Sequence, residues 1–177
     1  MADDYYLAFD LGAGSIRVML GRVDKGHLEI IPLPSTPNEI VNIEGSLHWD
    51  VLSIYSKILQ GMALCAANYT ESPVSIGIDT WGIDFGLLDA WGNLIGAPYC
   101  YRDRRTRGVM QEVFQMIPKA RLHELTGLES RPIHTIFQLY SMVRDKGPQL
   151  EIATDLLFMP DIFNYFLTGN KKASSPK

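Results

Sequence analysis

A short glycine-containing segment lies between two apolar stretches near the N-terminus, and it restricts how this part of the chain can fold. Residues 5–10 form an apolar run that ends in an acidic side chain, and residues 15–23 carry apolar side chains in loose alternation. Both runs have the length and pattern of β-strands. Gly12 and Gly14 stand in the segment between them, which is too short to hold a helical crossover. The two runs are therefore expected to pair as antiparallel strands.

A third apolar run is expected to complete an antiparallel meander. Residues 28–33 are rich in isoleucine and follow a turn at residues 24–27, where Gly26 can adopt a positive φ angle. Further along, apolar side chains recur at three- and four-residue steps over residues 51–65, which is typical of one face of an amphipathic helix. Asp50 precedes this stretch at the position of a helix N-cap. The first part of the chain therefore predicts strands followed by a capped helix.

Strands return after this helix, and helices dominate the second half of the chain. Residues 74–79 are expected to form a strand buried on both faces. Residues 83–88 are expected to pair with it or with a neighbour, and residues 94–97 follow after a turn. The remaining expected elements are helices at residues 106–117, 118–125, 135–146 and 160–167, with one more short strand at residues 155–159. This order of elements predicts the mixed α/β class, with a helical cluster in the second half.

The composition argues against several classes of protein. Of 177 residues, 46% are hydrophobic and 20% are charged, and the formal net charge is −4. The overall electrostatic field of a chain with this net negative charge therefore gives no reason to expect nucleic acid or an anionic membrane as a partner. The sequence has no run of about 18 apolar residues, as a transmembrane helix would need, and no secretory signal at its start. These features predict a cytoplasmic protein in which Cys65 and Cys100 are buried thiols.

The segment between the first two strands carries the first candidate site. Gly12 and Gly14 let backbone N–H groups converge, and such a nest can hold phosphate oxygens. Asp10 supplies a hard oxygen ligand at the edge of that nest, suited to Mg²⁺ directly or through water. Arg17 can give positive charge to a transferring phosphoryl group. Strand follows strand here, so this is neither a Walker A loop nor a dinucleotide-binding motif, and a plain glycine-rich hairpin is the alternative.

Two later segments carry candidate groups for a ligand rich in hydroxyl groups. Trp81 follows an apolar strand and offers a flat face for a sugar, Gly82 allows close backbone approach, and Asp84 can pair with hydroxyls. A core tryptophan beside a capped turn is the alternative. In the arginine-rich segment that follows, Arg102 and Asp103 can also contact ligand hydroxyls. The alternative there is a solvated charged loop that leads into a helix.

In their order and spacing, these segments resemble the N-terminal part of a carbohydrate kinase of the FGGY family. The resemblance runs from about Tyr6 to Gly169. The motifs that carry it are Asp10-Leu11-Gly12-Ala13 with Arg17, Trp49-Asp50, Ser75-Ile76-Gly77-Ile78-Asp79-Thr80-Trp81-Gly82 with Asp84-Phe85, Tyr101-Arg102-Asp103 with Arg105-Thr106, Gln138-Leu139, and Met159-Pro160-Asp161 with Leu167-Thr168-Gly169. It implies a ribonuclease-H-like (actin-like ATPase) fold with a mixed sheet, and phosphorylation of a ketose with ATP and Mg²⁺ as cofactors.

The resemblance also adds to the roles that the residues themselves suggest. The expected ATP-phosphate loop comprises Gly12, Ala13, Gly14, Ser15, Ile16 and Arg17, the expected metal ligand is Asp10, and the expected substrate contacts are Trp81, Gly82, Asp84, Arg102 and Asp103. The block at residues 77–85, which ends in Asp84-Phe85, is most similar to the branch of the family that converts L-rhamnulose to L-rhamnulose 1-phosphate. The family's catalytic base is an aspartate further downstream. This chain is therefore expected to hold no catalytic residue and to be inactive alone.

The expected domain organisation follows from the same resemblance. Residues 1–169 are expected to be a truncated N-terminal kinase domain, and residues 170–177 a polar tail or the point where a longer protein is cut. The C-terminal kinase domain, absent from this chain, is then its expected partner, besides the sugar and ATP. Two alternatives remain open. One is a kinase of the same family for another ketose or polyol, such as fuculose, xylulose or glycerol, and the other is a non-catalytic actin-like module that binds a nucleotide or a sugar.

Overall fold

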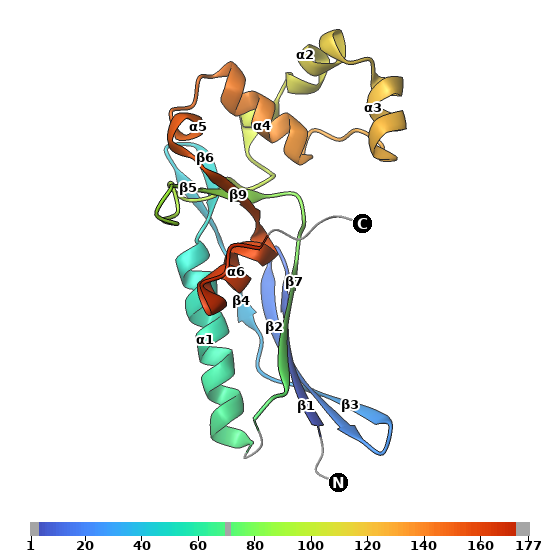
Figure 1. The fold of residues 1–177 in the computed structure, drawn as a ribbon, viewed down its shortest axis with the longest axis vertical. Coiled ribbons are helices and arrows are strands. Elements are labelled where there is room, and N and C mark those ends of the chain that lie inside the picture. Colours follow the sequence, from blue (N-terminus) through green and yellow to red (C-terminus); the bar gives the residue numbers. More distant parts are fainter. Residues whose placement is uncertain (1–3, 70–71, 173–177) are drawn as a thin grey trace. The chain divides into compact units, whose positions relative to one another are not determined.

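The computed structural model describes residues 4–69 and 72–172, which fall into two compact units (Figure 1). Within the described residues, unit 1 comprises residues 4–39, 50–69, 72–82 and 160–172, and unit 2 comprises residues 40–49 and 83–159, so the described chain passes from one unit to the other four times. The candidate phosphate loop belongs to unit 1. The arginine-rich segment belongs to unit 2.

Unit 1 is built on a mixed sheet, whose strand order is β3-β2-β1-β7. Its strands are β1 (Asp4–Leu11), β2 (Ser15–Asp24), β3 (His27–Pro32), the short β4 (Thr36–Pro37), which pairs with β2, and β7 (Ser75–Thr80). The first three form the expected antiparallel meander, whereas β7 pairs with β1 in parallel. The turn between β2 and β3 places Lys25 and Gly26 at positive φ, as the sequence predicted for Gly26.

Helix α1 (Val51–Asn68) covers one face of this sheet (Figure 1). Its N-terminus is capped as expected, because Asp50 Oδ1 accepts a hydrogen bond from the backbone N–H of Ser53 over 2.9 Å. Alternate side chains of the sheet turn toward the helix and are buried; they are Leu7, Phe9 and Leu11 on β1, and Ile16, Val18 and Leu20 on β2. The side chains between them, Asp10 and Arg17 included, therefore lie on the opposite face.

Unit 2 consists of two small antiparallel sheets and a group of helices. The sheets are β5 (Ile40–Ile43) with β6 (Ser46–Trp49), and β8 (Phe85–Leu88) with β9 (Asp155–Phe158); the helices are a 3₁₀ turn at Arg104–Thr106, α2 (Val109–Met116), α3 (Lys119–Thr126), α4 (Thr135–Arg144) and α5 (Gln149–Ile152). Phe137 of α4 packs in a core with Val109, Val113 and Leu122. The last helix, α6 (Met159–Thr168), leads back into unit 1, where Tyr55 Oη donates to the carbonyl oxygen of Phe166.

Several expected elements differ from the structure. The helix expected at residues 106–117 is divided, because Gly108 adopts a φ of 77° between the 3₁₀ turn and α2. Strand β8 pairs with β9 and not with β7, and residues 94–97 contribute only an isolated bridge between Leu94 and Leu88. Strand β7 is largely exposed rather than buried on both faces. Its pairing within the described residues is with β1 alone, which leaves it at the edge of the sheet.

Among the residues that the structure describes, no helix combines the length and the apolar character needed to cross a membrane.

Candidate functional site

The candidate phosphate loop is a tight reversal between β1 and β2. Leu11 and Ile16 are the last paired residues of the two strands, and the N–H of Gly12 donates to the carbonyl oxygen of Ser15 over 2.9 Å. A Cβ atom on Gly12 would lie 2.9 Å from that same carbonyl oxygen, so only glycine fits this position without a backbone shift. The expected loop, residues 12–17, therefore consists of this turn and the first residues of β2.

Asn38, which the sequence analysis did not single out, lies directly against this loop. Its backbone N–H donates to the carbonyl oxygen of Gly14 over 3.1 Å, and its side-chain Nδ2 donates to the carbonyl oxygen of Gly12 over 2.9 Å. Asn38 is only 6% exposed. A single asparagine in a proline-rich stretch gives no signal of this role, because the contact depends on β4 pairing with β2.

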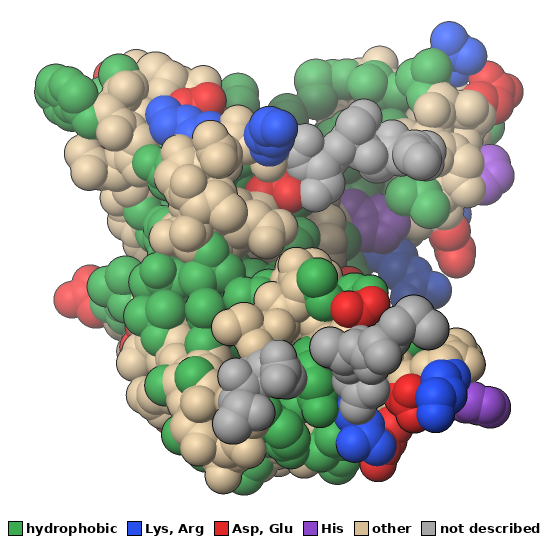
Figure 2. All heavy atoms as spheres, turned by 60° about the horizontal axis from the view of Figure 1, so that its bottom comes forward, with side chains coloured by type: hydrophobic (Ala, Val, Ile, Leu, Met, Phe, Trp, Pro, Cys, Tyr) green, Lys and Arg blue, Asp and Glu red, His purple; other side chains and the backbone are tan. Residues whose placement is uncertain are grey.

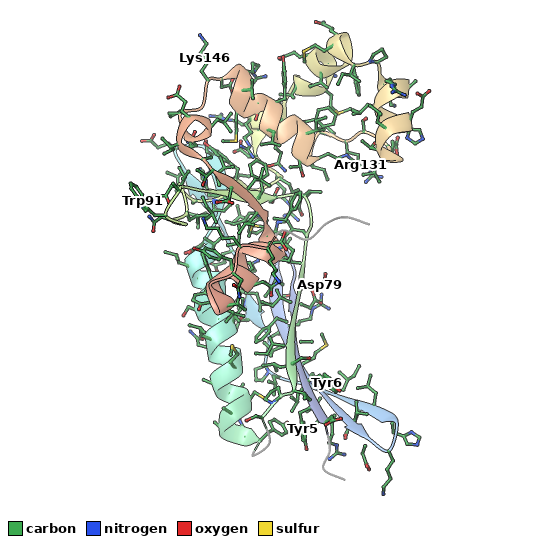
Figure 3. All side chains as sticks on the ribbon, viewed as in Figure 1. Tyr5, Tyr6, Asp79, Trp91, Arg131 and Lys146 are labelled. Carbon is green, nitrogen blue, oxygen red and sulfur yellow. The ribbon has the colours of Figure 1, made fainter. Side chains whose placement is uncertain are left out.

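Asp10 and Arg17 are paired across the two strands on the face away from α1. The Nη2 atom of Arg17 lies 3.1 Å from Oδ2 of Asp10, and both side chains remain partly exposed. Asp79 is in register with Asp10 on the other side, and Figure 3 shows it on the side of the sheet away from α1. Asp79 was missed as a site residue, although it comes near the end of its strand just as Asp10 does. The carboxylates of Asp79 and Asp10 and the guanidinium of Arg17 thus form one row across the neighbouring strands β7, β1 and β2.

The donor set of this row fits a hard divalent cation. Carboxylate oxygens are preferred ligands of Mg²⁺, and Asp10 and Asp79 supply them from adjacent strands. Residues 4–69 and 72–172 contain no group of three or more His, Cys, Asp or Glu side chains placed to hold a metal ion. Any Mg²⁺ here would therefore keep water molecules or phosphate oxygens as its remaining ligands, as this ion commonly does.

Trp81 and Gly82 follow β7 at the last positions that unit 1 contributes before the chain enters unit 2. Trp81 is half-buried and Gly82 is exposed. The exposed glycine backbone can approach a ligand closely because it lacks a side chain. The sugar contacts expected of Trp81 and Gly82 stay predictions.

Asp84 lies in the interior of unit 2 and is fully buried. Its Oδ2 accepts hydrogen bonds from Trp49 Nε1 over 2.6 Å and from the backbone N–H of Tyr101 over 3.0 Å, and its Oδ1 accepts one from Gln138 Nε2 over 2.8 Å. A buried carboxylate is tolerated only when donors satisfy it in this way. In this structure Asp84 therefore joins β6, the segment before the 3₁₀ turn and α4, rather than offering its oxygens to a ligand.

Asp103 has a similar place, whereas Arg102 does not. Asp103 is buried, with Oδ2 accepting from the N–H of Leu47 and Oδ1 accepting from the N–H of Arg105, both over 2.8 Å. The second bond caps the 3₁₀ turn. Arg102 is exposed, and its Nε donates to the hydroxyl of Tyr101 over 3.2 Å. Of the three expected sugar contacts in unit 2, only Arg102 therefore has its charged group at the surface.

Gln138 and Arg105 extend the network around Asp84. Gln138 is buried within the apolar stripe of α4, and its Oε1 accepts a hydrogen bond from Arg105 Nη2 over 2.6 Å. The Arg105 guanidinium lies 4.0 Å from the ring centroid of Tyr99, and burial lowers its pKa from the usual value. Neither role was predicted from the sequence; the available signal was a glutamine at a position where the helical pattern calls for an apolar residue.

Comparison with known proteins gives these residues a family context. The chain matches the model of the N-terminal domain of the FGGY family of carbohydrate kinases over residues 5–175. A rhamnulokinase of Bacteroides thetaiotaomicron is 40% identical over 164 residues, which is 93% of this chain and 34% of that protein. A rhamnulokinase of Oceanobacillus iheyensis is 38% identical over 165 residues, 93% of this chain and 35% of that protein. The chain thus spans about a third of the length of these relatives.

Solved structures agree at the level of the fold. A gluconate kinase from Lactobacillus acidophilus superposes with a TM-score of 0.83 at 14% identity, over 96% of this chain and 34% of that one. A ligand-bound xylulose kinase from the same organism gives 0.81 at 15% identity, over 94% of this chain and 34% of that one. These likenesses confirm the expected actin-like, ribonuclease-H-like α/β fold.

Proposed function

This chain belongs to the FGGY family of carbohydrate kinases, and from that premise we propose that the whole protein transfers the γ-phosphoryl group of ATP to a hydroxyl group of L-rhamnulose. The observation that carries the kinase proposal is the cross-strand pair of Asp10 and Arg17 beside the Gly12–Ser15 turn. An acidic metal ligand, a fixed positive charge and a glycine-containing backbone turn in one place form a set suited to a polyphosphate. A structural hairpin would need the glycine-containing turn but neither of the two charged side chains beside it.

The ATP end of the proposed site lies in unit 1. Because the N–H of Gly12 is bonded to Ser15, other backbone N–H groups of the loop at residues 12–17 would bind the β- and γ-phosphates, and Arg17 would neutralise charge on the phosphoryl group in transfer. Asp10, with Asp79 beside it, would hold Mg²⁺ directly or through water. When bound, the ion supplies charge neutralisation between the two phosphates.

The sugar end of the proposed site uses the exposed groups. Within unit 1, Trp81 would stack against the apolar face of the ketose and Gly82 would allow its hydroxyls to reach the backbone. Arg102 of unit 2 is exposed and is a separate candidate donor to sugar hydroxyls. Asp84 and Asp103, whose oxygens are already bonded within unit 2, would have a structural role in that unit instead of contacting the sugar. L-rhamnulose is the proposed sugar because two of the similar proteins are rhamnulokinases.

The chemical step needs a group outside this chain. The sugar hydroxyl oxygen forms a bond to the γ-phosphorus while the bond from that phosphorus to the bridging oxygen of ADP breaks, and the hydroxyl proton passes to a base. We assign the base to an aspartate in the rest of the protein. The products are L-rhamnulose 1-phosphate and ADP, and the setting is the cytoplasm, where ATP is available.

The proposed organisation makes residues 1–169 part of an N-terminal domain that works with a C-terminal domain of the same protein. Residues 170–172 are polar, and residues 173–177, the end of the expected tail, lie outside the described residues. Hydrophobic side chains lie at the surface (Figure 2), and those of unit 1 include Tyr6, Leu64 and Val74. Exposed apolar side chains of this kind are what a covering domain would bury. Closure of the two domains would exclude water from the phosphoryl group.

A turnover assay of the whole protein tests the proposal. ADP release with MgATP would be followed with L-rhamnulose, L-fuculose, D-xylulose and glycerol at equal concentrations, and the highest kcat/KM is expected for L-rhamnulose. A higher value for another of these compounds would overturn the substrate assignment and keep the kinase. Absence of ADP release with all four would contradict the kinase proposal. The 177-residue chain assayed alone is expected to be inactive, and robust turnover by it would place the base within these residues.

A further inference from the structure

We propose that Asn38 is a positioning residue that orients the backbone of the phosphate loop, so that the N–H groups of Ala13 and Ser15 face the nucleotide. The kinetic part of this inference rests on the proposed function, whereas the orientation of the loop does not. The inference starts from two hydrogen bonds that hold the loop from one side.

Asn38 donates hydrogen bonds to two carbonyl oxygens of the loop. Its Nδ2 donates to Gly12 over 2.9 Å, and its own N–H donates to Gly14 over 3.1 Å. Since the N–H of Gly12 is bonded to Ser15 inside the turn, that group is also fixed. The loop therefore has little freedom to rotate its peptide planes while Asn38 is in place.

Planar peptide geometry then determines where the neighbouring N–H groups point. In a trans peptide the carbonyl of one residue and the N–H of the next lie on opposite sides of the chain, and the described residues contain no cis peptide bond. With the carbonyls of Gly12 and Gly14 turned toward Asn38, the N–H groups of Ala13 and Ser15 must point away from it. Two N–H groups that both point to the side away from Asn38 can bind oxygens of one phosphate group.

Strand pairing and a bond from α1 hold the segment that contains Asn38 in place. Asn38 directly follows β4, in which Pro37 is in register with Ser15 and Thr36 with Ile16. On the other side, Lys57 of α1 donates from Nζ to the carbonyl oxygen of Pro37 over 2.8 Å. The asparagine side chain is 6% exposed and therefore shielded from competing water. The segment that orients the loop is thus tied to the sheet through β4 and to α1 through the bond from Lys57 to Pro37.

Amide hydrogen exchange of the wild-type whole protein tests the orientation without any substitution. Under conditions in which the protein stays folded, NMR of perdeuterated protein should show slow exchange at Gly12 and Asn38 and fast exchange at Ala13 and Ser15. Magnesium tripolyphosphate should then shift the Ala13 and Ser15 amide resonances and slow their exchange. Protection of Ala13 and Ser15 equal to that of Gly12 in the free protein would overturn the proposal, and so would an unchanged pair of resonances at saturating tripolyphosphate.

Kinetics of two variants test the consequence. Asn38→Ala removes the Nδ2 donor, and Asn38→Asp replaces it with an oxygen that repels the carbonyl of Gly12. Both should lower kcat/KM for MgATP at least tenfold while the KM for the sugar stays within twofold. Asn68→Ala is the matched control, because it also removes a bond from Nδ2 to a carbonyl oxygen in unit 1, that of Leu64, at an exposed helix end. Its kcat/KM should equal that of the wild type.

The outcomes separate the possible failures. If both Asn38 variants keep the wild-type kcat/KM for MgATP, or if the KM for the sugar rises as much as that for MgATP, the positioning role is wrong. If the wild type phosphorylates no sugar, the proposed function fails, and the exchange and tripolyphosphate experiments still decide the orientation. Should the variants fold poorly, the wild-type exchange pattern remains the deciding measurement.

Discussion

Arg17 lies directly opposite Asp10 on the neighbouring strand, with its Nη2 atom 3.1 Å from Oδ2 of the carboxylate. The two side chains are 60% and 33% exposed. An ion pair in such contact with water contributes only about 0–1 kcal/mol to the free energy of unfolding. The pair therefore adds little to stability, which agrees with the role in phosphate and metal binding that we propose for it.

The first prediction separates function from stability at this pair. Asp10→Asn and Arg17→Gln should each lower kcat/KM of the whole protein by about 100-fold or more, because charge stabilisation of the transferred group is lost. Their free energies of unfolding, measured by urea titration, should stay within about 1 kcal/mol of the wild type. The control is Arg22→Gln, which breaks the ion pair with Glu29 further along the same strand and should leave turnover unchanged. Wild-type turnover in the Asp10 variant would remove it from the proposed site.

The second prediction concerns the buried carboxylate of unit 2. Trp49→Phe keeps most of the ring but removes the N–H that donates to Asp84, so a buried acceptor loses one of its donors. The expected cost is about 1–3 kcal/mol in the free energy of unfolding, read from the urea midpoint. Trp91→Phe is the control, since Trp91 is 87% exposed and should change stability by less than about 0.5 kcal/mol. Equal effects of the two substitutions would contradict the structural role assigned to Asp84.

The third prediction tests how closely α1 approaches the sheet. A Cβ atom at Gly61 would lie 2.9 Å from Cε1 of Phe9 and 3.0 Å from Cγ2 of Val18. Gly61→Ala should therefore destabilise the protein by about 1–3 kcal/mol, although alanine favours helix more than glycine does. Gln60→Ala on the exposed face of the same helix should be close to neutral. A stabilised Gly61→Ala variant would show that the helix can move away from the sheet at little cost.

The fourth prediction is a pH dependence at Cys100. Burial raises the pKa of this thiol from the model-compound value of 9.0 to about 11. Because the folded state holds the proton more tightly, its contribution to stability is complete below pH 9 and is lost as the pH rises through 11. Iodoacetamide should therefore label Cys100 slowly at pH 8 in the folded protein and rapidly in denaturant, as mass spectrometry can measure. Equally rapid labelling in both states would show that the thiol is accessible.

Much of unit 1 could be predicted from local sequence signals. The glycine-containing connection required a hairpin, and the apolar period after Asp50 required a capped helix; both are confirmed. Unit 2 was harder, because its short strands are defined by partners distant in the sequence. Phe85 pairs with Phe158, and no local pattern in either strand indicates the other. The exposure of β7 was also missed, since an apolar strand looks the same whether or not a second neighbour covers it.

The same distinction holds for the candidate site. The loop could be located because glycines and an aspartate at a strand end are visible in one short stretch. Asn38 could not, because it comes beside the loop only through strand pairing. Asp79 also stands near a strand end, but the sequence does not show that its strand lies next to that of Asp10. Asp84 was identified as an important residue but not as a buried one. Its donors, Trp49 and Gln138, come from segments 35 and 54 residues away, so their convergence is a property of the fold.

The alternation of the chain between its units has a consequence for how the protein can be divided. Unit 1 recruits α6 only after residues 83–159 have been inserted, so no uninterrupted stretch of sequence encodes either unit. Bringing the two ends of so long an insertion together costs conformational entropy, and only the docking of α6 onto unit 1 offsets that cost. During synthesis the sheet and α1 would therefore lack the contacts with α6 until the chain through Thr168 had been made and had left the ribosome.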